Sequence, residues 1–122
     1  MEYAIDTMKT ILLEHKVPGE EIKLIVSRDG LHLASSGLDD EEKDTFSAMC
    51  ATMYGAGETA FFATGRESVK YIGIYSKESH LYIVEAGEHA LVTVVVTSSQ
   101  SSDKVLSAIL VIAKDVSKLD LS

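Results

Sequence analysis

The sequence predicts one α+β domain with the element order α-β-β-α-β-β-β-α, spanning residues 1–122. Two β-rich runs flank Asp29-Gly30 and predict a hairpin. Three further β-rich runs between residues 68 and 97 predict a meander, and apolar residues recur at helical spacing at both ends and in the middle of the chain. This order favours a five-stranded antiparallel sheet with one long helix on one face and the N- and C-terminal helices on the other.

Composition and charge exclude several classes of partner. The net charge is −8, and no basic stripe is present to neutralise phosphates, so we expect no nucleic acid partner and no attraction to an anionic membrane. No apolar run approaches the roughly 20 residues of a membrane span, and the N-terminus lacks a continuous signal-peptide core. The single cysteine fits a reducing compartment. We therefore expect a cytoplasmic protein without direct membrane insertion.

The first third of the chain predicts a helix followed by a hairpin. The helix covers residues 2–16 and stops before Val17-Pro18, because proline disfavours helical geometry in the preceding residue. The strands are expected at 22–28 and 31–36, with a type I′ turn at Asp29-Gly30.

The long helix is expected over residues 40–64, with Asp39 as its N-cap. At 100° per residue, one side is apolar and should face the core. Its members are Phe46, Met49, Cys50, Met53, Gly57, Ala60 and Phe61. The other side carries small residues and little charge apart from Glu58. Its members are Ala48, Ala51, Thr52, Gly55, Thr59 and Phe62. Small residues permit close approach of a second helix, so this side predicts contact with another subunit; the alternative is another helix of the same chain.

The second half predicts three strands and a final helix. The strands are expected at 68–76, 80–86 and 90–97, and the last is apolar at nearly every position, as in a central strand covered on both faces. The final helix begins after Ser101 or Ser102. Its apolar stripe is Val105, Leu106, Ile109, Ile112, Ala113 and Val116.

The element order and the first hairpin together resemble the Roadblock/dynein light chain superfamily, especially its stand-alone archaeal and bacterial members. The residues that carry the resemblance are 24–36, LIVSRDGLHLASS, followed at once by an acidic helix start. The resemblance implies a non-enzymatic dimeric scaffold or regulator that binds a small Ras-like GTPase; some members stimulate GTP hydrolysis or nucleotide exchange. The partners it implies are that GTPase and either a second copy, forming a homodimer, or a paralogous Roadblock protein.

The resemblance also implies an interface. In the family, the third strands pair antiparallel and the second helices pack beside the two-fold axis. On this sequence the pairing strand is 68–76, and we expect one of its faces to carry Val69, Tyr71, Gly73 and Tyr75, and the other Ile72 and Ile74. The helix contributes the small side described above. The predicted interface is therefore Ala48, Ala51, Thr52, Gly55, Thr59, Phe62, Val69, Tyr71, Gly73 and Tyr75.

No catalytic, cofactor or metal site is predicted. The segment Gly55-Ala56-Gly57-Glu58 lacks the ending of a phosphate-binding loop and lies inside a helical pattern. The four histidines have no metal-ligand spacing, and Cys50 is expected to be an inert buried thiol. Arg28 is expected to be solvated. Arg66 is weighed as an arginine finger against a surface charge or a pairing with Glu67 or another acid.

The sequence is also compatible with a second function. Related α+β sandwiches host ligands, so a small-molecule or signal-sensing domain is the alternative. It predicts a pocket between helices and sheet and a ligand that raises thermal stability. The sequence contains no cluster of convergent polar core residues, which favours the scaffold.

Overall fold

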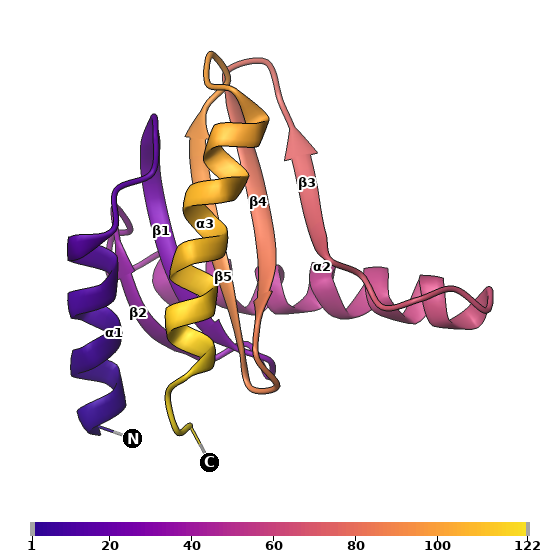
Figure 1. Cartoon of the computed structure of the whole chain (residues 1–122), viewed down its shortest axis with the longest axis horizontal. Helices are drawn as coiled ribbons and strands as arrows, with labels where there is room; N and C mark the ends of the chain where they lie inside the picture. Colours follow the sequence, from indigo (N-terminus) through magenta and orange to yellow (C-terminus); the bar gives the residue numbers. More distant parts are fainter. Residues whose placement is uncertain (1, 122) are drawn as a thin grey trace.

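The computed structural model describes residues 2–121 and confirms the predicted element order (Figure 1). Three helices and five strands form the α+β fold. Their bounds are α1 Glu2–Glu14, β1 Glu20–Ser27, β2 His32–Ser36, α2 Lys43–Ala63, β3 Tyr71–Tyr75, β4 Ser79–Ala86, β5 Ala90–Thr97 and α3 Ser102–Ser117.

One antiparallel sheet contains all five strands in the spatial order β2-β1-β5-β4-β3. The hairpin and the meander meet where β1 pairs with β5, with Leu24 opposite Thr93 and Ile25 opposite Val92. The last strand in sequence is thus the middle strand in space, and it is buried on both faces as predicted. Because β5 is hydrogen-bonded to β1 on one side and to β4 on the other, neither of its backbone edges is exposed.

The sheet is covered by helices on both faces, which confirms the predicted layers (Figure 1). Alternation along β5 sends Val92, Val94 and Val96 to the α1 and α3 side. Leu91 packs instead in the cluster under α2, together with Tyr54. Each side of the sheet therefore has its own apolar core, and the sheet separates them.

The end of α1 is held by Lys23 of β1. The side chain of Lys23 is only 2% exposed, and its Nζ donates to the carbonyl oxygens of Leu12 and His15, the latter at 3.1 Å. It also pairs with the carboxylate of Glu20 at 3.0 Å. The last carbonyls of a helix lack partners within the helix and carry partial negative charge. A buried lysine on the neighbouring strand satisfies both the hydrogen bonding and the charge.

The hairpin turn differs from the prediction. A type I′ turn needs positive φ at both central residues, but among the described residues only glycines have positive φ, with Gly30 at +92°. The N–H of Gly30 donates to the Ser27 carbonyl at 2.9 Å, and the N–H of Ser27 donates to the Leu31 carbonyl at 2.9 Å. The pattern is that of a type I turn followed by a glycine bulge, which lets Asp29 keep an ordinary conformation.

The long helix begins later than predicted, at Lys43 rather than at residue 40. Asp39 is not its N-cap: the cap position is Glu42, which makes no side-chain cap bond. Residues 40–42 form a separate turn, closed by the Glu42 N–H on the Asp39 carbonyl at 3.0 Å. The third strand is also shorter than predicted and covers Tyr71–Tyr75.

The buried side of α2 is only partly the predicted one. Cys50 is buried as expected, but its buried companions are Ser47 and Tyr54. Met49 and Phe61 from the predicted stripe are about half exposed. Phe61 is exposed because the last turns of the helix pass beyond the sheet and have no core to face (Figure 1). In the first turns, Ser47 takes the buried position and Met49 faces outward.

The Lys23→Met variant should lose about 3 kcal/mol of unfolding free energy, because it leaves two helix carbonyls and Glu20 without their buried partner. Urea unfolding followed by circular dichroism measures this loss. The matched control is Lys104→Met at an exposed position, expected within about 0.5 kcal/mol of wild type. Equal urea midpoints for the two variants would contradict the role given to Lys23.

Candidate functional site

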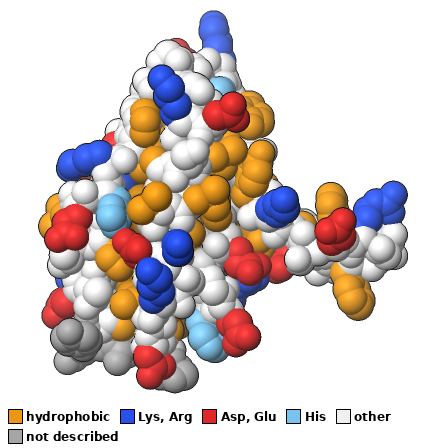
Figure 2. Space-filling view, in the orientation of Figure 1, with side chains coloured by type: hydrophobic (Ala, Val, Ile, Leu, Met, Phe, Trp, Pro, Cys, Tyr) orange, Lys and Arg blue, Asp and Glu red, His pale blue; other side chains and the backbone are white. Residues whose placement is uncertain are grey.

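The second helix crosses under the sheet and leaves it at β3 (Figure 1). Gly57 marks the crossing, since a Cβ there would lie 2.9 Å from the Cδ1 atom of Ile72 in β3. Every residue from 59 to 68 is exposed, and we call this segment the α2 arm. Phe62 on the arm is 84% exposed. Figure 2 shows the arm as a projection from the body of the molecule, with apolar and charged side chains upon it.

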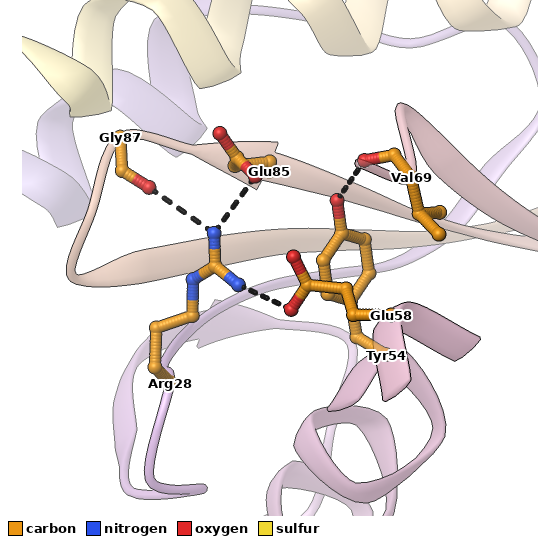
Figure 3. Close-up of polar contacts among 6 residues, drawn as sticks. All are labelled: Arg28, Tyr54, Glu58, Val69, Glu85 and Gly87. Carbon is orange, nitrogen blue, oxygen red and sulfur yellow. Dashed lines mark hydrogen bonds and ion pairs between the residues drawn. The ribbon is translucent and has the colours of Figure 1, made fainter. Parts of the chain in front are cut away.

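Arg28 connects α2, at the start of the arm, to the sheet (Figure 3). Its guanidinium pairs with Glu58 of α2 and with Glu85 of β4, each at 2.9 Å. It also donates to the Gly87 carbonyl at 3.5 Å and lies 5.2 Å from the centre of the Tyr54 ring. The expectation that Arg28 is solvated was wrong. The turn after β1, helix α2 and strand β4 converge on this side chain, and two carboxylates face its one positive charge.

Tyr54 holds the other end of the arm, at Val69, where the chain returns to the sheet. Its hydroxyl donates to the Val69 carbonyl at 2.6 Å (Figure 3). Burial, followed by the charges of Glu85 and Glu58, raises the pKa of Tyr54 to about 12. The residue is 1% exposed, and its raised pKa keeps the hydroxyl protonated as the donor to Val69.

The edge of the sheet beside the arm is open and apolar. Within the described residues β3 pairs only with β4, so its outer backbone groups have no strand partner. Tyr71, Ile74 and Tyr75 are each more than 40% exposed. Unpaired N–H and C=O groups on an apolar edge form a template for another strand. The edge and the arm lie next to each other and together form the candidate interface.

The structure brings most of the predicted interface residues to this region. Gly73 is half-buried between exposed Tyr71 and Tyr75 on β3. The exposed residues of α2 in this set are Thr52, Gly55, Thr59 and Phe62. The helices α1 and α3 lie on the opposite face of the sheet, so within residues 2–121 no second helix covers them, and the same-chain alternative is wrong.

Three predicted residues are placed differently. Ala48 and Ala51 are half-buried, and a Cβ on Gly30 would lie 3.2 Å from the Ala48 Cα atom and 3.6 Å from the Ala51 Cβ atom. They therefore pack against the hairpin of their own chain. Val69 precedes β3 and packs in the cluster under α2. Tyr71 contacts Tyr82 in the cluster on the other face, so Val69 and Tyr71 do not share a face as predicted.

The remaining candidate groups show no catalytic arrangement. Cys50 is buried, and burial raises the pKa of its thiol. Gly55 and Gly57 lie within α2, as expected for residues that are not a phosphate loop. Arg66 is exposed and donates to the Thr64 carbonyl at 2.8 Å. No group of three metal-binding side chains exists in the described part of the chain, and none of its helices is long and apolar enough to cross a membrane.

Sequence reasoning missed the residues that position the arm. The Arg28 and Glu58 contact joins positions 30 residues apart, and no local pattern indicates it. Tyr54 had a usable signal, because it follows Cys50 by four positions and so lies on the same side of the helix.

The fold is an α+β domain whose sheet has one open apolar edge at β3. Residues 9–96 match the model of the Roadblock/LC7 domain, and the chain belongs to this family. The predicted resemblance is thereby confirmed.

Solved structures of the family share the fold. An MglB with a tetrameric arrangement is 23% identical, with a TM-score of 0.76 over 95% of this chain and 86% of that one. The Roadblock/LC7 domain from Streptomyces avermitilis is 19% identical, with a TM-score of 0.78 over 95% and 93%. Myxococcus xanthus MglB is 14% identical, with a TM-score of 0.82 over 93% and 87%. A comparison with curated proteins found no match.

The Tyr54→Phe variant should change how stability depends on pH. The folded state holds the Tyr54 proton up to a pKa of about 12, whereas unfolded tyrosine ionises near 10. The free energy of unfolding therefore falls as the pH rises through this interval. The variant lacks this titration and should lose less stability there; burial also raises the pKa of Tyr82, so part of the decline remains.

Urea midpoints measured across this alkaline range test the expectation. At neutral pH the same variant should be less stable by about 1 kcal/mol, through loss of the bond to the Val69 carbonyl. An alkaline decline as steep as that of wild type would show that Tyr54 is not the titrating group.

Proposed function

We propose that this protein is a non-enzymatic dimeric scaffold or regulator that binds a small Ras-like GTPase in the cytoplasm. The observation that carries the proposal is the open apolar edge of β3 beside the α2 arm. Membership in the Roadblock/LC7 family supports it, because that family implies dimeric platforms for such GTPases. The tetrameric arrangement of one similar MglB structure supports assembly of this fold into larger units.

In the proposed dimer, β3 pairs antiparallel with β3 of a second copy, and the two sheets become continuous. Helix α2 runs six residues past Gly57 to its end at Ala63, about 9 Å at the helical rise of 1.5 Å per residue, and this sets the reach of the arm. That length equals about two strand spacings, so the arm reaches beneath the partner's sheet. Phe62 would then be buried against the partner, which removes an exposed aromatic side chain from water.

The second copy is either this same chain or a paralogous Roadblock protein that presents the same edge. The GTPase would dock on the surface that the two α2 helices make together. The interface residues in this proposal are those predicted from the sequence. Among them, Ala48, Ala51 and Val69 contribute indirectly, by packing α2 and the segment before β3 against the rest of the chain. We assign Arg66 no catalytic role in this proposal.

Sedimentation at micromolar concentration should show a particle of about twice the 13.2 kDa chain mass. Gly55→Arg and Phe62→Asp should each shift it to the monomer, because they place a charge in the contact. Both sites are open, with nothing within 4 Å of a Cβ on Gly55, so the fold should survive. The control Leu110→Asp changes an exposed apolar residue on α3 and should leave the dimer intact. A wild-type protein that stays monomeric would refute the homodimer.

Binding to the small Ras-like GTPases of the source organism tests the partner. Each GTPase is loaded with GDP or with a non-hydrolysable GTP analogue, and its affinity for the wild-type protein is measured by calorimetry. We expect one GTPase to bind, with an affinity that differs between its two nucleotide states. Dimer-breaking variants should weaken this binding. Absence of binding in both states for every GTPase tested would refute the regulator.

A further inference from the structure

A groove lies at the end of α2 opposite the arm. Its volume is about 550 Å³. The apolar part of its lining comes from the start of β1, the segment after β2 and the first turns of α2: Ile22, Leu38, Phe46 and Met49. Three of these side chains are half-buried, and Met49 is 51% exposed. In the described structure no side chain of this protein fills the hollow, so an apolar surface here faces water.

Acidic residues line the same groove. Glu41 and Glu42 are both exposed and belong to its wall. They lie within residues 39–44, DDEEKD, which contain five acids and one lysine. The net charge of this short segment is −4, half of the −8 of the entire chain. Its lysine, Lys43, is paired with Asp40 at 2.7 Å. The negative charge beside the groove is therefore concentrated and largely uncompensated.

We propose that this groove binds a segment of another protein in which apolar side chains stand between lysines or arginines. Burial of the apolar side chains against Phe46 and Met49 supplies the affinity. The carboxylates of Glu41 and Glu42 attract the basic residues and select this partner over neutral or acidic segments. The same carboxylates repel nucleic acid and anionic lipid, so a basic protein segment is the complementary occupant.

The groove is separate from the proposed dimer interface and does not depend on it. Its strand residue, Ile22, lies in β1, which is three strands in from the β3 edge. A partner arm of about 9 Å spans only about two strand spacings. The groove thus stays open in the dimer, and one dimer offers two such grooves.

Titration with synthetic peptides, followed by nuclear magnetic resonance of the labelled full chain, tests the proposal. The probe is a peptide of about 12 residues with leucines at helical spacing among lysines. A peptide of the same composition in scrambled order and a peptide with glutamates for lysines are the comparison ligands. We expect the probe to shift the signals of Ile22, Leu38, Phe46 and Met49, and its affinity to fall with added salt.

Variants of the groove and of a distant surface make the test specific. The double variant Glu41→Gln, Glu42→Gln and the single variant Met49→Asp should each weaken probe binding about tenfold. The double variant Glu14→Gln, Glu88→Gln makes the same charge change at exposed sites elsewhere and should bind as wild type does. Sedimentation of the groove variants should remain that of the wild-type dimer, so the groove and the dimer are tested by separate measurements.

Three results would overturn the proposal. The first is equal binding of the probe and the scrambled peptide, and the second is a set of shifts spread over other acidic surfaces. The third is self-association that the groove variants abolish, which would assign the groove to a second copy of this chain.

Discussion

The pairing of β1 with β5 is the contact on which the rest of the structure depends. It joins a hairpin made early in the chain to a meander made late, and each alone is a two- or three-stranded ribbon with few partners. Residues of this ladder contribute to both cores: Leu24 and Leu91 under α2, and Ile25 and Val92 under α1 and α3. A slip of one position in this ladder would exchange the two sets of side chains between the faces.

Two cations, Lys23 in the middle of β1 and Arg28 just past its end, connect the helical layers to that ladder. Lys23 faces α1 and satisfies its final carbonyls, whereas Arg28, just past the strand, reaches α2 and β4 on the other side. Each cation has both charge partners and carbonyl acceptors, although the Nε of Arg28 is buried without a hydrogen-bond partner. The direction of the α2 arm, and with it the geometry of the candidate interface, follows from the second of these contacts.

The local sequence pattern was sufficient to predict the helices, the strands and their layers. It was insufficient to predict contacts between segments that are distant in the sequence. The apolar run of β5 and the Asp29-Gly30 signal led to the central strand and the hairpin, because both depend on neighbouring residues. The side of α2 that is buried depends on how the helix crosses the sheet, which explains the misplaced Phe61. The contacts of Arg28 and the own-chain packing of Ala48 depend on segments 18 to 59 residues away, and no periodicity reports them.

The separation of the two central strands has a kinetic consequence. Leu24 and its ladder partner Thr93 are 69 positions apart, so loop closure over most of the chain precedes the main pairing. On a ribosome adding about 5 to 20 residues per second, β1 would wait several seconds for β5 to be made. Throughout that interval one apolar edge of β1 is unpaired. The period of greatest vulnerability to aggregation is therefore set during synthesis, by the position of β5 near the end of the chain.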